Sequence, residues 1–135
     1  MKARLIPLIV ALVAGLTLVA PSASAPPAGY SVQIEREATL VSPLTLAVSV
    51  VVQCPAGKGG VTVRVVVSQP QTVGPNTEGT APPMSITCTG AKQMLSMTVV
   101  RMSGGATFSV GSAFAQADVV VGFLVAQDFR VITIS

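Results

Sequence analysis

The stretch LTLAVSVVVQC, residues 44–54, carries an apolar side chain at every second position. The stretch VTVRVVVSQ, residues 61–69, repeats this alternation after an interval, PAGKGG, that is rich in glycine. Successive side chains of a β-strand point to opposite faces of the sheet, so a period of two is typical of a strand with one buried face. The two stretches therefore predict two strands that pair as a hairpin, with Cys54 near Val61.

Shorter alternating stretches predict further strands before and after this hairpin. They lie near Val32 and Ile34, at 84–88, at 95–99, at 108–121 with a bend at Gly111, and at 129–134. Prolines interrupt residues 69–83, where at most an edge strand fits. Short strands separated by turn residues, without a helical period, are typical of an all-β sandwich with Greek-key connections. We therefore expect residues 26–135 to form a single antiparallel, immunoglobulin-like β-sandwich of about seven strands.

The first 25 residues have the composition of a secretory signal peptide. Lys2 and Arg4 precede an uncharged apolar run at 5–20, and small residues follow up to Ala25. This order directs export, and the run is too short and too interrupted for a permanent bilayer span. We expect cleavage within residues 22–28, a secreted, extracellular mature chain, and membrane contact only through the signal peptide before cleavage.

Cys54 and Cys88 are the two cysteines of the chain. Each ends an alternating stretch and shares the inward parity of its strand. In an exported chain two such cysteines form a structural disulfide, here closing a loop of about 35 residues. A redox-active pair would need a Cys-x-x-Cys motif or an electropositive thiolate site, and the sequence offers neither.

The composition argues against several classes of function. The chain has no histidine, the residue that most often serves as a general base or a metal ligand. We expect no catalytic residue, no metal site and no cofactor, and we predict that the protein is not an enzyme. The mature chain keeps six of the eight basic residues against five acidic ones, and the six basic residues are spread singly. A nucleic-acid partner would need a basic stripe, so we expect none.

Two carboxylate pairs are candidate sites. Glu35 and Glu37 share one face of the predicted first strand, and adjacent carboxylates there are typical of a solvated edge. Asp118 and Asp128 bracket an uncharged stretch and would bind calcium only if the fold joined them to further oxygen ligands. We interpret both pairs as solvated charges.

Four apolar residues form a predicted interaction surface: Val51, Val66, Val120 and Phe123. Val51 and Val66 face outward in the expected hairpin. Val120 and Phe123 belong to the uncharged stretch 119–125, which is apolar on both faces if it is one strand. Such a strand needs cover on both sides, either from the chain itself or from a partner, and the sequence leaves both open.

The motifs CPAG at 54–57, ITCTG at 86–90 and FSVGSA at 108–113, together with the stretch 50–69, carry a resemblance. They resemble a family of small, secreted, two-cysteine β-sandwich proteins that is common in actinobacteria. The resemblance covers residues 44–135. It implies an immunoglobulin-like fold and a disulfide, and it implies no activity, because that family has no known function.

These observations predict a non-catalytic interaction module, secreted or at the cell surface. Its partner would be another protein chain or a component of the cell envelope. An alternative is a carrier that holds a small apolar ligand in a cleft between two sheets, and a hydrolase is a remote alternative. The sequence leaves the oligomeric state open.

Overall fold

A computed structural model describes residues 29–102 and 104–135, so the predicted signal peptide lies outside the described residues. The regular elements in this part of the chain are all strands. Their bounds are β1 (Ser31–Ile34), β2 (Glu37–Ser42), β3 (Thr45–Gln53), β4 (Val61–Gln69), β5 (Thr77–Thr80), β6 (Met84–Ile86), β7 (Gln93–Arg101), β8 (Gly111–Val120) and β9 (Leu124–Ile134). Among the residues just given, no helix is long and apolar enough to cross a bilayer.

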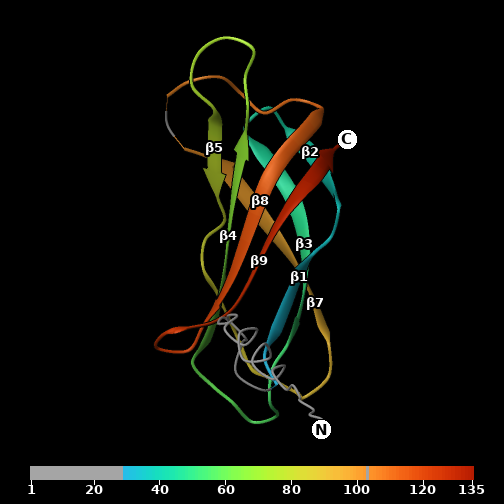
Figure 1. The fold of residues 1–135 in the computed structure, drawn as a ribbon, viewed down its shortest axis with the longest axis vertical. Coiled ribbons are helices and arrows are strands. Elements are labelled where there is room, and N and C mark those ends of the chain that lie inside the picture. The colour runs from blue at the N-terminus through green and yellow to red at the C-terminus, as the bar shows by residue number, and fades with distance from the viewer. Residues whose placement is uncertain (1–28, 103) are drawn as a thin grey trace, which may run out of the picture.

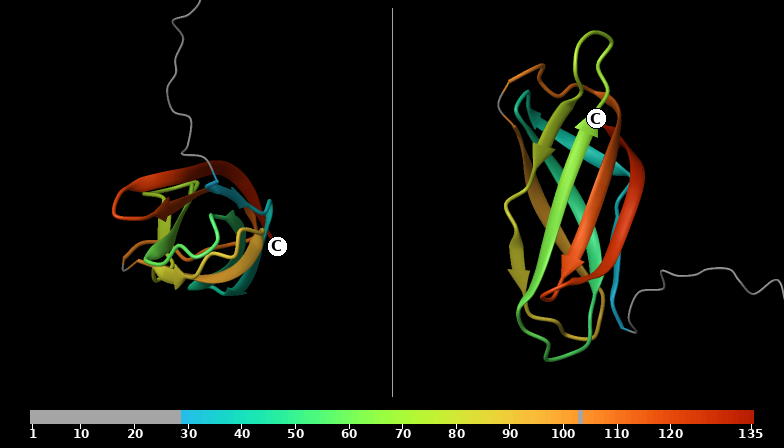
Figure 2. Two further views of the ribbon diagram at one scale, coloured as in Figure 1. Left: turned by 90° about the horizontal axis from the view of Figure 1, so that it is seen from below. Right: turned by 60° about the vertical axis from the view of Figure 1, so that its left-hand side comes forward.

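The strands form one closed barrel (Figure 1). Around the ring the order is β3, β2, β9, β8, β4, β5 and β7, and β7 pairs again with β3. β1 lies beside β2 on the same edge of β3, and β6 lies beside β5 on the same edge of β4. Figure 2 shows the ring from below. The all-β prediction is confirmed, but the predicted immunoglobulin-like sandwich is wrong, because the strands join into a single seven-strand barrel with two extra strands.

The expected hairpin between β3 and β4 is also wrong. β3 pairs with β1, β2 and β7, whereas β4 pairs with β5, β6 and β8. The glycine-rich segment 54–60 therefore connects two distant parts of the ring. An alternation of period two fixes which side chains face inward, but it does not fix which strand lies alongside.

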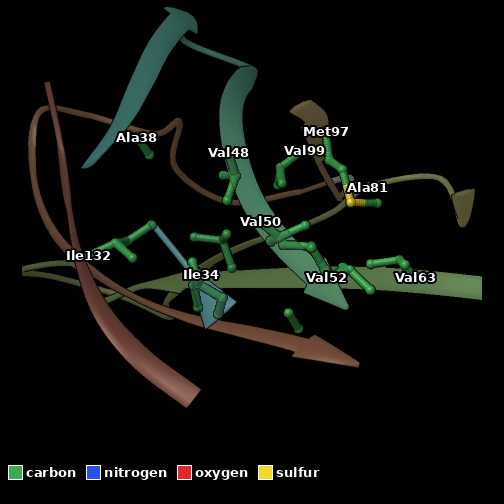
Figure 3. Close-up of a cluster of buried hydrophobic side chains, with 14 of the residues drawn as sticks. Ile34, Ala38, Val48, Val50, Val52, Val63, Ala81, Met97, Val99 and Ile132 are labelled. Atoms are coloured by element: carbon green, nitrogen blue, oxygen red, sulfur yellow. The ribbon is translucent and has the colours of Figure 1, made fainter. Parts of the chain in front are cut away.

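Small and branched side chains fill the interior of the barrel. Val48 and Val50 on β3 and Val63 on β4 are fully buried, and Figure 3 shows side chains from several strands converging on this core. β8 contributes mainly alanines to the same interior: Ala113, Ala115 and Ala117, with Val119 near its end. Because opposite walls can approach closely across such small side chains, a narrow ring encloses a packed core.

The predicted disulfide between Cys54 and Cys88 is confirmed, with 5.4 Å between the two Cα atoms. It joins the end of β3 to the segment that follows β6. Backbone hydrogen bonds reinforce this link: Gly57 N donates to Cys88 O at 3.1 Å, and Gly90 N donates to Cys54 O at 3.1 Å. The bond is compatible with an extracellular location, where disulfides persist.

Replacing both cysteines, as in Cys54→Ser with Cys88→Ser, should lower the free energy of unfolding by about 2 to 5 kcal/mol. The unfolded chain regains the freedom of the loop that the bond closes. Urea unfolding followed by circular dichroism measures the change. Free thiols detected by alkylation of the unreduced protein would contradict the assignment of the bond.

Phe108 closes the end of the barrel that carries the loops 70–76 and 104–110, the upper end in Figure 1. Its side chain is buried although it precedes β8, and its backbone N donates to Pro43 O at 2.9 Å. The ring of Phe108 lies over Gly79 on β5. A Cβ atom at Gly79 would lie 2.7 Å from Phe108 Cζ and 2.8 Å from Val99 Cγ1, so this position has room only for glycine.

Gly79→Ala should destabilise the barrel by about 1 to 3 kcal/mol, because the added methyl group overpacks a filled core. Gly59→Ala is the matched control. A Cβ atom at Gly59 meets no atom within 4 Å, and its backbone is not in the left-handed region. Equal melting temperatures for the two variants would show that Phe108 does not seal the upper end as described.

Candidate interaction surface

Four exposed apolar side chains gather on the outer side of three neighbouring strands. They are Val66 on β4, Phe114 on β8, and Phe129 and Val131 on β9, with exposed fractions of 41%, 47%, 66% and 57%. Phe114 lies directly opposite Val131, and Gln116 lies between Val66 and Phe129 in the strand register. Side chains of directly opposite residues touch across a sheet. We call this set of four residues the apolar face.

A groove continues the apolar face across the short strand β5. It has a volume of about 630 Å³ and is lined, among others, by Val66, Thr80, Pro82, Val100 and Met102. Thr80 pairs with Val66 on one side and with Val100 on the other. Because threonine is flanked here by two exposed valines and β5 ends at this point, the outer surface is hollowed over Thr80.

A charged pair borders the apolar face. Arg64 on β4 lies opposite Asp118 on β8, with 4.0 Å between Arg64 Nη2 and Asp118 Oδ2. The side-chain amides of Gln116 and Gln127 both donate to Asp118 Oδ1, at 3.2 and 3.0 Å. An ion pair this open to solvent contributes little to stability. Its effect is to place a polar rim beside an apolar patch, which is the usual anatomy of a protein interface.

The second aspartate has a structural role. Asp128 on β9 is half-buried, and its Oδ2 accepts a hydrogen bond from Ile34 N at 2.8 Å and lies 3.6 Å from Arg130 Nε. Asp118 and Asp128 lie on opposite faces of neighbouring strands and do not meet. Within the part of the chain that the structure describes, no three or more acidic or cysteine side chains are grouped to hold a metal ion.

The structure separates the four residues of the predicted interaction surface. Val51 is half-buried on β3, on the opposite side of the ring from β4, between Gln33 and Met94. Val66 belongs to the apolar face. Val120 is half-buried opposite Thr62, two outward positions along β4 from Val66.

Phe123 is exposed in the turn between β8 and β9. The expectation of one two-faced strand at 119–125 is wrong, because β8 ends at Val120 and β9 begins at Leu124. Gly122, with a φ of 75°, allows the tight reversal between them. The middle of the apolar stretch is therefore a turn. The expectation that both faces of a single strand need to be covered does not apply to it.

Sequence reasoning missed Phe114, Phe129 and Val131. A signal was present in β9, where apolar residues occupy both parities: 129 and 131 on one, 132 and 134 on the other. Only Ile132 and Ile134 face the core. A strand with apolar residues at both parities cannot bury both in a barrel whose outer side is open, so one set must be exposed.

Comparison of the chain with protein-family models and with curated proteins finds no match. The resemblance to the secreted two-cysteine family therefore stays a prediction. What the protein does has to be argued from its own surface.

Replacing two residues of the apolar face, as in Phe129→Thr with Val131→Thr, should leave the free energy of unfolding within about 0.5 kcal/mol of the original, because exposed positions contribute little. Threonine also keeps the preference for strand conformation. Val119→Ser, at a fully buried position of β8, should cost about 2 to 4 kcal/mol. Chemical denaturation of the variants measures both changes, and similar losses would place the apolar face in the core.

Proposed function

We propose that the protein is a non-catalytic, exported interaction module whose apolar face binds another protein chain. The observation that carries the proposal is the position of Val66, Phe114, Phe129 and Val131 on three adjacent strands. Single exposed apolar residues are ordinary, but a contiguous set with a polar border is typical of an interaction site. Large, rigid aromatic side chains such as Phe114 and Phe129 are the kind that anchor interfaces.

The proposed compartment rests on the disulfide and on the leading sequence. A disulfide is maintained in oxidising surroundings, and residues 1–25 have the order of a secretory signal. The partner would accordingly be a protein of the medium or of the cell envelope. Exposed side chains on the outer surface of adjacent strands suit a protein surface better than they suit a small molecule.

A carrier of a small apolar ligand is the second candidate. The predicted cleft between two sheets has no counterpart in a single closed sheet with a packed interior. The observation in favour of a carrier is the outer groove of about 630 Å³, whose walls include Val66, Val100 and Met102. Because this groove is open to solvent, it supports the carrier less than the apolar face supports the module.

Native mass spectrometry of the exported protein, recovered from the medium and from the cell surface, tests the proposal. We expect a bound second chain, and we expect Phe129→Thr with Val131→Thr to abolish its binding. Val73→Ser is the matched control, because Val73 is 86% exposed in the loop after β4, away from the apolar face, and this variant should keep the second chain.

Two other results would contradict the module. If the protein from the medium and from the cell surface is a monomer without a bound second chain, the proposed partner chain is contradicted. A small apolar molecule retained by the original protein, and lost on Val100→Ser, would favour the carrier instead.

A further inference from the structure

Four segments meet at one end of the barrel, the lower end in Figure 1 and in the right-hand view of Figure 2. They are the start of the described chain at 29–30, the loops at 54–60 and 87–92, and the turn at 121–123. Cys88 N donates to Lys58 O at 3.3 Å, which joins the two loops. Gly29 packs against Pro55, and the pairing of Val120 with Thr62 brings the turn beside the start of β4. We call these four segments, with Leu124, the lower end.

The lower end combines positive charge with exposed apolar side chains. Lys58 and Lys92 are both exposed, and its sequence holds no other charged residue. Phe123 and Leu124 are 65% and 49% exposed at the tip of the β8–β9 turn. The loops at the upper end, 70–76 and 104–110, expose Val73 and Val110 but contain no basic residue.

We propose that the lower end docks on an anionic lipid surface. Phe123 and Leu124 would enter the boundary between headgroups and acyl chains, where aromatic and leucine side chains are favoured. Lys58 and Lys92 would lie at the level of the lipid phosphates. Each lysine near an anionic surface strengthens binding roughly fivefold.

A lipid surface fits this end better than a protein surface does. Apolar tips beside lysines match the two layers of a bilayer interface, in which acyl chains lie beneath negative headgroups. The chain also enters the barrel here: the 28 residues before Gly29, with the apolar run at 5–20, join the lower end.

This site is separate from the apolar face, so the inference does not depend on the proposed function. Phe123 lies at the end of the barrel, whereas Phe129 and Val131 lie on its side. If only the lower end contacts the lipid, the side of the barrel stays exposed. Docking on lipid would therefore present the apolar face to a partner instead of covering it.

Co-sedimentation of the exported protein with vesicles tests the proposal. One set of vesicles contains equal parts of phosphatidylglycerol and phosphatidylcholine, and the other contains phosphatidylcholine alone. We expect binding to the anionic vesicles, weakened by added salt because screening acts on the lysines. Lys58→Gln with Lys92→Gln should weaken it by roughly 30-fold.

The variant Phe123→Ser with Leu124→Ser should weaken binding to the anionic vesicles by roughly tenfold or more. Val73→Ser with Val110→Ser is the matched control, because it removes two exposed apolar residues from the upper end, and it should leave binding unchanged. Circular dichroism verifies that each variant is folded.

Three results would overturn the proposal. One is a protein that stays in the supernatant with both kinds of vesicle. Another is binding that depends on the lysines but not on Phe123 and Leu124, since this would be general electrostatic attraction. The third is binding lost with Phe129→Thr and Val131→Thr instead, which would assign lipid contact to the apolar face and would contradict the proposed function at the same time.

Discussion

The barrel depends on both edges of β3 being occupied. β1 and β2 share one edge, β7 takes the other, and β2 continues the ring by its parallel pairing with β9. An unpaired strand edge exposes backbone N–H and C=O groups that pair readily with other chains. A closed ring satisfies most of these groups internally, so a small protein with many exposed apolar side chains avoids random edge-to-edge pairing.

Closure also explains why so much apolar surface faces outward. A narrow ring has room inside for one set of side chains from each strand, and on β8 that set is three alanines and Val119. Larger residues such as Phe114, next to those alanines, lie on the outer side. The interior volume, more than any local preference, decides which parity of an apolar strand is buried.

Local features of this fold could be predicted from the sequence, and long-range features could not. The alternation at 44–54 and 61–69 corresponds to β3 and β4, and the parity of Cys54 and Cys88 indicated their bond. The predicted pairing of β3 with β4 was wrong, and so was the predicted sandwich, because short alternating strands are compatible with a barrel as well as with a sandwich.

The candidate surface was predicted only in part, for the same physical reason. Val66 faces outward as predicted. Phe123 is exposed in a turn instead of lying in a covered strand, and Val51 and Val120 are half-buried beside neighbours that the sequence could not specify. The exposure of Phe114, Phe129 and Val131 follows from the curvature of the ring. Curvature depends on all strands together, so no single stretch of sequence reveals it.

The last strand completes the ring, and this has a consequence for the timing of folding. Asp128 on β9 accepts a hydrogen bond from the backbone N of Ile34 on β1, at a sequence separation of 94. Ser135 N donates to Ala38 O at 2.9 Å. Contacts between such distant segments form slowly, because a long stretch of chain must be ordered before they can be made. β1 and β2 can pair with β3 earlier, but the ring does not close until β9 is present. If the chain crosses a membrane N-terminus first, the ring cannot close until β9 has also passed.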